Sequence, residues 1–540
     1  MRLFDNIWRD ATAERPPSTQ GAAGELLAAI ANKLDVDQVG YADLPPSAFF
    51  LLDLSKLGFK GMDLNVVMVA HPPEDDATAQ TQAGLLAQYK HAVESFGFCF
   101  VIYLGTEADT VDRSVPEWLE SVLLKSADLR RMLDSPLPSS VLFEAVRCQV
   151  RLALLCPFNT THAARGDTFR GRKRELERLT LDLDSGFLIS GARRIGKTSL
   201  LKRACHELHV RGPYRRLGAK DERVFYFDCL TWRDYWDCCY RMAHSIDPRL
   251  ELRIEKGPRN ISYLLERKSH GGQRPLLLFF DEMDVVINTD SHAGWPFLRL
   301  LAEAAHRRWI RVVFAGYRSM YQLLFQENVH PNSVPDAKVR TPFDRALEPL
   351  MLRPLSQSDT GSLVREPFER VGIPLRDEDA LLRRIWEGTR GNPWLIQFYG
   401  EQLFRSASER VPQEVHFTDL EELEGGFELG DFLMTHFLEN TLEHGQPVPT
   451  ERLCAFLFAH HDVTPCWAVG DFVAACRGVG SNASLNEVNS ALRNLCYTGL
   501  LSFEHDRYFF ALPIIRRKLR NSFPDLSQVL PELLPSHPTP

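Results

Sequence analysis

A glycine-bounded run of basic and hydroxyl residues carries the clearest chemistry in this sequence. The run Gly191-Ala-Arg-Arg-Ile-Gly196-Lys197-Thr198 fits the pattern G-x-x-x-x-G-K-[ST]. It lies between an apolar stretch, Phe187–Ser190, and a helical pattern that begins near Lys197. Glycines let consecutive backbone N–H groups turn inward, and the start of a helix adds partial positive charge. Because a triphosphate needs many such donors at once, the run predicts a phosphate-binding loop.

The residue types in this loop suggest separate roles. The Lys197 ammonium would reach the β- and γ-phosphates, and the Thr198 hydroxyl would ligate Mg²⁺. The alternative is a glycine-rich turn that binds no ligand, and the flanking strand and helix favour the nucleotide site. The predicted nucleotide-binding residues are Gly191, Ala192, Arg193, Arg194, Ile195, Gly196, Lys197, Thr198 and Ser199.

A second apolar run ends in carboxylates, in Arg274-Pro-Leu-Leu-Leu-Phe-Phe-Asp281-Glu282. A continuous apolar run is typical of a strand buried on both faces, and ligands bind at the carboxyl ends of such strands. Asp281 is predicted to hold Mg²⁺ together with Thr198, and Glu282 to activate the attacking water. The two runs therefore predict binding of a nucleoside triphosphate with Mg²⁺ and its hydrolysis, with Lys197, Asp281 and Glu282 as catalytic residues.

Composition sets broad limits on the class of protein. The chain has 540 residues, 44% of them hydrophobic and 25% charged, which is ordinary for several globular domains. Its net charge of −8 argues against a molecule that binds nucleic acid or anionic membranes over its whole surface. The polar start of the chain and the lack of a long apolar run predict a cytoplasmic protein with no membrane partner. The eleven cysteines form no C-x-x-C pair, which indicates buried free thiols.

The elements that would position the loop and the carboxylates predict an α/β fold with several domains. Strand patterns separated by helical patterns indicate a P-loop NTPase parallel sheet with a helical lid, preceded by a small sheet covered by helices. The predicted domains are an N-terminal α/β domain at 1–155, a linker at 156–167, a P-loop ATPase core at 168–355, a helical lid at 356–440, a winged-helix domain at 441–520 and a Pro-rich tail at 521–540.

The N-terminal domain lacks the pattern of a Mg²⁺-dependent nuclease. Such an enzyme would need an Asp at one strand and [DE]-x-K on the next. Asp63 precedes the strand predicted at Leu64–Ala70, but the next predicted strand, Phe98–Leu104, holds neither a carboxylate nor a lysine. The acidic run at 74–76 is interpreted as a solvated loop. The domain is therefore interpreted as a sensing or partner-binding module.

Further motifs follow one another in a recognisable order. They are Gly171-Arg172-x-x-Glu175, the phosphate-binding loop, FFDEMD at 279–284, FAGYR at 314–318, TPFDR at 341–345 and GNPWLIQ at 391–397. This order resembles the STAND ATPases of bacteria and archaea, which are related to NACHT and NB-ARC proteins and to origin-recognition-type AAA+ ATPases. The resemblance covers about residues 168–520. It implies a nucleotide-dependent switch in which Arg172 packs over the nucleotide base and Pro393 contacts the adenine nucleotide from the lid.

Several assignments stay open at this level. Arg318 or Ser319 could sense the γ-phosphate or simply begin a helix. Arg340 and Arg345 could stabilise charge at the site or form surface ion pairs. Arg172 could be part of a charged helix start. Because no repeat array follows the ATPase, sensing must fall to residues 1–155 or to another chain.

Residues 451–520 have the pattern of a winged helix. The third helical pattern, Leu485–Gly499, carries only Glu487 and Arg493 as charges, so DNA recognition by this helix is not favoured. The function predicted is an ATP-dependent switch that changes its own assembly, as a homo-oligomer, or the activity of a protein partner in bacterial defence or signalling. The alternative is a DNA-associated AAA+ ATPase of the transposition or origin-loading type, using the basic residues Arg516, Arg517, Lys518 and Arg520.

Overall fold

In a computed structural model, the contacts within the chain divide it into two units. The first unit comprises Met1–Arg170, Gln357–Arg384 and Leu395–Leu423, and the second comprises Gly171–Ser356, Ile385–Trp394 and Glu424–Pro540. The finer domain boundaries given above stay predictions. The structure describes residues 10, 21–44, 47–54, 57, 65–92, 98–105, 121–150, 152, 155–161, 163–164, 169–211, 223–248, 258–316, 347–433, 449–461, 466–497, 499–522 and 530.

A mixed five-stranded sheet forms the centre of the first unit. In the order β1-β2-β3-β4-β5, β2 pairs antiparallel with both β1 and β3, whereas β3, β4 and β5 run parallel to one another. Every residue of β3 and β4 is buried, which explains their continuous apolar sequences. The strands are β1 (Asp37–Leu44), β2 (Ser47–Asp53), β3 (Asn65–Ala70), β4 (Cys99–Tyr103) and β5 (Ser121–Leu123).

Helices supply the apolar cover on both faces of this sheet. On one face, Ala83 and Leu86 of α3 join Phe49 and Val101 of the strands in a buried cluster. Hydrophobic side chains of three other helices face the opposite side of the sheet. The helices are α2 (Ala22–Leu34), α3 (Asp76–Ala92), α4 (Ser126–Asp134) and α5 (Pro138–Arg147).

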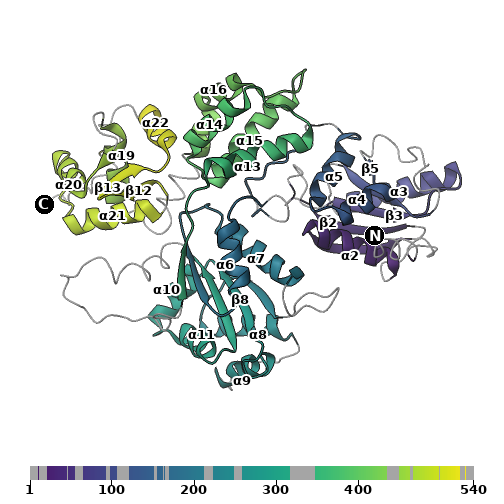
Figure 1. The fold of residues 1–540 in the computed structure, drawn as a ribbon, viewed down its shortest axis with the longest axis horizontal. Coiled ribbons are helices and arrows are strands. Elements are labelled where there is room, and N and C mark those ends of the chain that lie inside the picture. Colours follow the sequence, from purple (N-terminus) through teal and green to yellow (C-terminus); the bar gives the residue numbers. More distant parts are fainter. Residues whose placement is uncertain are drawn as a thin grey trace. The chain divides into compact units, whose positions relative to one another are not determined.

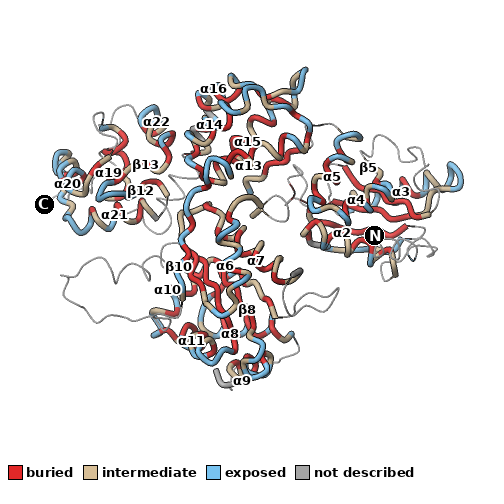
Figure 2. Tube along the Cα trace, in the orientation of Figure 1, coloured by how far each residue is buried: buried red, intermediate tan, exposed pale blue. Residues whose placement is uncertain are grey.

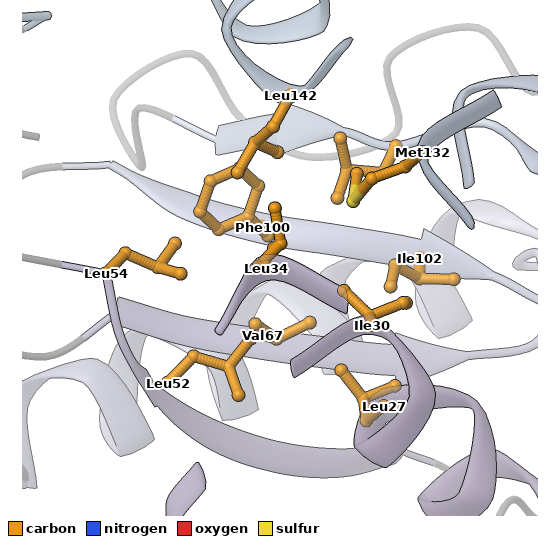
Figure 3. Close-up of a pocket in the computed structure, with 11 residues that line it drawn as sticks. Leu27, Ile30, Leu34, Leu52, Leu54, Val67, Phe100, Ile102, Met132 and Leu142 are labelled. Atoms are coloured by element: carbon orange, nitrogen blue, oxygen red, sulfur yellow. The ribbon is translucent and has the colours of Figure 1, made fainter. Parts of the chain in front are cut away.

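The space between α2 and the sheet is packed core. Figure 3 shows Leu27 and Ile30 of α2 pointing toward Val67 and Phe100 of the strands. The cavity that these apolar side chains line measures about 10 Å³, which is room for about one water molecule. Pockets that hold small molecules are tens of times larger. This cavity therefore identifies no ligand for the predicted sensing module.

The sequence pattern does not predict the hairpin β1–β2; in this part of the chain it predicts the strands seen as β3 and β4. The β2 segment is apolar without a break from Ala48 to Leu52, and a short apolar run does not distinguish a strand from a buried helix. In β1, Gly40 and the acidic residues weaken the strand pattern. The hairpin pairing, for example Tyr41 opposite Phe50, is what stabilises both segments as strands.

Four helices of the predicted lid contribute to the first unit. Helix α13 contacts α5 of the N-terminal part. Helices α14 and α15 also contribute residues to the second unit. Their bounds are α13 (Gln357–Val371), α14 (Glu378–Thr389), α15 (Pro393–Ser408) and α16 (Phe417–Gly425).

The segment that composition predicts as a linker packs tightly within the first unit. Phe158 is 3% exposed, and its ring centroid lies 5.0 Å from that of Phe368 on α13. A Cβ added to Gly400 of α15 would lie 2.3 Å from the Phe158 ring, so only glycine fits there. The Asn159 backbone N–H also donates to Gln397 Oε1 at 2.9 Å. This segment therefore shares a core with the lid helices.

Replacing Phe158 with alanine is expected to lower the free energy of unfolding of the first unit by about 3–5 kcal/mol, because a buried aromatic ring leaves a cavity. Urea denaturation would measure the change. Tyr263→Ala is the control, since Tyr263 is 63% exposed on the helix Pro258–Lys268 of the second unit and its loss removes little packing. Equal losses in the two variants would contradict the assignment of Phe158 to the core.

A wholly parallel five-stranded sheet forms the centre of the second unit (Figure 1). Its order is β10-β6-β9-β8-β7, and β8 and β9 are buried at every residue. This sheet confirms the predicted α/β fold class. The strands are β6 (Gly186–Ser190), β7 (Val224–Asp228), β8 (Leu276–Asp281), β9 (Ile310–Ala315) and β10 (Leu347–Met351).

Helices again cover both faces of the parallel sheet, and its inner strands β8 and β9 are buried throughout (Figure 2). Helix α7 contacts β7, β8 and β9, and α6 contacts α7. The opposite face is an aromatic core in which the rings of Phe227 and Phe280 stack with centroids 4.9 Å apart. The helices are α6 (Lys173–Leu181), α7 (Lys197–Arg211), α8 (Tyr235–Ile246), α9 (Pro258–Lys268), α10 (Asp284–His292) and α11 (Pro296–His306).

The C-terminal part of the second unit contains the elements predicted for a winged helix. Helices α19, α20 and α21 accompany a small antiparallel sheet of order β11-β13-β12, whose first strand lies between α19 and α20 in the chain, and a last helix follows. Within the described part of the chain, no helix combines the length and apolarity needed to cross a membrane. The elements are α17 (Phe427–Leu433), α19 (Pro449–His460), β11 (Cys466–Trp467), α20 (Val469–Gly478), α21 (Leu485–Tyr497), β12 (Leu501–Glu504), β13 (Arg507–Phe510) and α22 (Pro513–Ser522).

Candidate functional site

The two halves of the predicted site meet at the carboxyl edge of the parallel sheet. Strand β6 ends at Ser190 and leads into the loop 191–196, after which α7 begins at Lys197. Strand β8 ends at Asp281, and α10 begins three residues later. In the sheet, β9 lies between these two strands. Ligands bind at this edge in open α/β sheets.

The backbone of the loop depends on its two glycines. Gly191 packs so closely that an added Cβ would lie 3.0 Å from the Leu352 carbonyl oxygen. Gly196 has φ of +98°, a conformation that costs glycine little and other residues more. Gly196 also accepts the first hydrogen bond of α7, from the Leu200 N–H at 3.0 Å. The loop therefore delivers the N-terminus of α7, with its partial positive charge, to the edge of the sheet.

Lys197 places a buried ammonium group inside the loop. Its side chain is 9% exposed, and Nζ donates to the carbonyl oxygens of Gly191 at 3.0 Å and Ala192 at 3.1 Å. Burial lowers the pKa of Lys197, and the carboxylates of Glu282, Asp284 and Asp281 oppose this shift. A phosphate group would stabilise this charge more strongly than loop carbonyls do, because it carries negative charge of its own.

The carboxylates of Asp281 and Glu282 differ in their surroundings. Asp281 is 2% exposed, and its two oxygens accept from the Tyr226 hydroxyl at 2.9 Å and the Glu282 N–H at 3.0 Å. Burial and then the charge of Asp281 raise the pKa of Glu282. The Glu282 backbone has φ of +52°, which is uncommon outside glycine and often found at functional positions.

Arg172 binds the loop itself. It precedes α6 with φ of +61° and is 8% exposed. Its guanidinium donates to the Ile195 carbonyl oxygen at 3.1 Å and pairs with Glu175 at 3.3 Å. The motif Gly-Arg-x-x-Glu thus lies against the phosphate-binding loop, and the base contact implied by the resemblance stays a prediction.

The start of helix α15 also reaches the loop. Gly391 leaves no room for a side chain, because an added Cβ would lie 2.1 Å from the Leu355 carbonyl oxygen. Pro393 begins the helix and Asn392 caps it by accepting from the Trp394 N–H at 3.1 Å. The Arg194 guanidinium carbon lies 3.5 Å from the centroid of the Trp394 ring.

Trp394 is stacked on both faces. Phe432 of α17 lies on it with ring centroids 4.3 Å apart and planes 20° from parallel. Arg194 has φ of +60°, and burial, followed by repulsion from Arg193, lowers the pKa of its guanidinium to about 10. We call the three residues Arg194, Trp394 and Phe432 the loop stack. It joins the phosphate-binding loop to α15 and α17.

The chain resembles solved Walker-type ATPases. A Walker-type ATPase of Pyrococcus abyssi is 17% identical, with a TM-score of 0.46 over 67% of this chain and 99% of that one. The ORC2 protein of Aeropyrum pernix is 12% identical, with a TM-score of 0.44 over 66% of this chain and 96% of that one. Cdc6p of Pyrobaculum aerophilum is 14% identical, with a TM-score of 0.30 over 65% of this chain and 94% of that one. No protein-family model and no curated protein matches the chain. At these values the likeness carries no argument about function.

The residues at the sheet edge fit a nucleotide with Mg²⁺. A buried ammonium, a helix N-terminus and a glycine position with no space for a Cβ form the kind of cradle that binds phosphates. Hydroxyl and carboxylate oxygens, from Thr198 and Asp281, are ligands that Mg²⁺ prefers. Among the described residues, no cluster of His, Cys, Asp and Glu side chains is arranged to bind another metal.

Some predicted site residues lie outside the described part of the chain. These are Arg318, Ser319, Arg340, Arg345 and Asp63. The acidic run at 74–76, in contrast, is described and begins helix α3, where Asp75 accepts from the Thr78 N–H at 2.7 Å. Its position at a helix start gives it a structural role in capping.

The basic residues of α22 are largely engaged within the second unit. Arg516 donates to the His461 carbonyl oxygen, and Lys518 to that of Gly426 at 2.8 Å. Arg517 lies 4.0 Å from the buried Glu424 carboxylate. Two of the four basic residues, Arg516 and Lys518, therefore already bind backbone oxygens of the same unit, and the DNA-associated alternative stays open.

Three residues near the site were missed in the sequence analysis: Tyr226, Trp394 and Phe432. Tyr226 could have been suspected only from the register of β7 against β8. Trp394 stands next to the predicted Pro393, but its contact with Arg194 joins positions 200 residues apart. Such long-range contacts leave no periodic signal in a single sequence.

Proposed function

We propose that this chain is a nucleotide-dependent switch that binds ATP or ADP with Mg²⁺ and hydrolyses ATP slowly. The loop stack is the observation that carries the switch. It puts a residue of the phosphate-binding loop, Arg194, in direct contact with Trp394, beside the Pro393 that the resemblance assigns to the nucleotide. A change in the loop therefore has a physical route to helix α15.

Electrostatics suggest how a bound nucleotide would act on the contact between Arg194 and Trp394. The contact between Arg194 and Trp394 is partly desolvated, so it is worth on the order of 1–2 kcal/mol. The Arg194 guanidinium also lies near a second cation, Arg193, which repels it. Phosphate groups entering the loop would attract both cations. Because ATP and ADP differ in phosphate charge, they would favour the stacked arrangement of Arg194 to different extents, which is what a switch requires.

The remaining residues of the site would bind and activate the nucleotide. Lys197 and the backbone N–H groups of the loop would hold the β- and γ-phosphates, and Arg172 would keep the loop in shape through Ile195. Thr198 and Asp281 would hold Mg²⁺, which supplies charge neutralisation to the phosphate oxygens. Glu282 would orient the attacking water and take its proton.

A second contact supports transmission toward the C-terminal helices. A Cβ added to Gly499, in the turn before β12, would lie 2.8 Å from the Ala192 Cβ of the loop. The turn after α21 therefore touches the loop from a different element than the loop stack does. We propose that the output is a change in self-assembly or in a partner protein. A role in bacterial defence or signalling rests on the resemblance alone.

The test is the mass of the purified chain in solution without nucleotide, with ADP and with ATP. We expect ATP alone to shift the chain to a larger assembly. Trp394→Ala should bind ATP within about threefold of wild type, because the ring contacts Arg194 and is assigned no contact with the phosphates, but should lose most of the mass shift. Wild-type mass that stays the same in all three conditions would contradict the assembly switch. A mass shift retained in Trp394→Ala would show that the loop stack is not part of the assembly switch.

A further inference from the structure

Tyr226 reaches across the sheet to one of the proposed Mg²⁺ ligands. The register of β7 against β8 places Tyr226 opposite Phe279, two residues before Asp281. Side chains alternate along a strand, so Phe279 and Asp281 point to the same face. Diagonal neighbours on one face lie within reach of an aromatic side chain. The Tyr226 hydroxyl uses this geometry to donate to Asp281 Oδ2 at 2.9 Å.

A second donor holds the other oxygen of the same carboxylate. The Glu282 backbone N–H donates to Asp281 Oδ1 at 3.0 Å. Two donors on different oxygens fix the rotation of the carboxylate about its side-chain bond. A carboxylate offers about four lone-pair positions, so each oxygen keeps about one for another partner. The arrangement therefore orients Asp281 without using up its capacity to bind a cation or its water.

The Tyr226 ring is itself held in place. Its neighbours Phe225 and Phe227 pack toward the aromatic core on the opposite face of the sheet. On the α7 side, the Lys202 ammonium lies 5.2 Å from the centroid of the Tyr226 ring. Burial, and then the charge of Asp281, raises the pKa of Tyr226, so the phenol keeps its proton and remains a donor at neutral pH.

We propose that Tyr226 is a positioning residue that fixes the Asp281 carboxylate for Mg²⁺. The proposal rests on the nucleotide function proposed above. A group that orients a metal ligand through a hydrogen bond changes metal affinity by about 10–100-fold when it is removed. Tyr226 acts through Asp281 and is not assigned any contact with the nucleotide.

The test is Tyr226→Phe, which keeps the ring and removes only the donor. We expect the Mg²⁺ concentration that half-saturates binding of a fluorescent ADP analogue to rise about 10-fold. The control is Tyr240→Phe, which removes a hydroxyl from a ring that is 50% exposed on α8 and should leave the Mg²⁺ requirement unchanged. The readout is binding, so it does not depend on hydrolysis.

A double-mutant cycle separates positioning from general weakening. In an Asp281→Asn background, Tyr226→Phe should change the Mg²⁺ requirement less than about twofold, because its partner is already altered. An unchanged requirement in Tyr226→Phe, or the same change in both backgrounds, would overturn the proposal. Wild-type protein that does not bind ADP with Mg²⁺ at all would contradict the nucleotide function itself, which distinguishes the two failures.

Discussion

Lys197→Ala is expected to weaken ATP and ADP binding by about 100-fold, which is the largest change in affinity that the site predicts. The Lys197 ammonium is the buried cation of the loop, and it would face the phosphates with little water to screen the interaction. Losing one partner of a buried charge-assisted pair costs about 2–5 kcal/mol, and about 2.7 kcal/mol corresponds to 100-fold. Equilibrium binding of a fluorescent ATP analogue would measure the loss.

The variant is expected to remain folded. Burial already penalises the charge of Lys197, which is why its pKa is lowered, so alanine removes a cost as well as two hydrogen bonds to loop carbonyls. Lys173→Ala is the matched control, because that ammonium is exposed at the start of α6. ATP affinity retained in Lys197→Ala, with the fold intact, would exclude the loop as a phosphate site.

Glu282→Gln is expected to bind ATP within a few-fold of wild type and to hydrolyse it about 10²–10⁴-fold more slowly. Glutamine keeps the size of the side chain but cannot accept the proton of the attacking water. The raised pKa of Glu282 also predicts that hydrolysis by wild type rises with pH through a value above the ordinary 4.5 of a glutamate, because only the carboxylate is a base. Phosphate release and retention of bound ATP would be measured together.

Glu266→Gln is the control for this second variant, since its carboxylate is exposed on α9, which packs on the face of the sheet opposite α7. It should hydrolyse ATP at the wild-type rate. Hydrolysis by Glu282→Gln at that same rate would remove Glu282 from the role of base. Loss of ATP binding in Glu282→Gln would instead indicate that the side chain supports the loop.

The parts of this site that could be predicted from the sequence are those with a local signal. The loop 191–198 and the strand ending at Asp281 each carry their pattern in fewer than a dozen residues, and the structure brings both to one edge of the sheet. The interaction of Tyr226 with Asp281 depends on the register between two strands. The stack of Arg194 on Trp394 depends on where the lid helices fold.

In the N-terminal part, too, contacts between residues far apart in the chain could not be predicted from local sequence. Segment 156–161 has the polar and proline-containing composition of a linker, and yet Phe158 is buried. Its burial depends on the space left by a glycine 242 positions later in the chain, at Gly400, and composition does not report such complementarity. The hairpin β1–β2 was missed for a related reason, since only its cross-strand pairing distinguishes its apolar run from a helix.

The packing of the Phe158 ring against Gly400 affects how a truncated chain would behave. A shortened protein that begins after this segment would lack the Phe158 ring, which would leave a cavity beside Gly400 and expose Phe368 to water. Newly exposed apolar surface promotes aggregation and premature clearance by cellular quality control. If such a truncated protein loses its activity, the cause could therefore be a damaged lid as readily as the absence of a sensing domain. Point substitutions within the sheet β1–β5 are the sounder way to examine what the N-terminal part contributes.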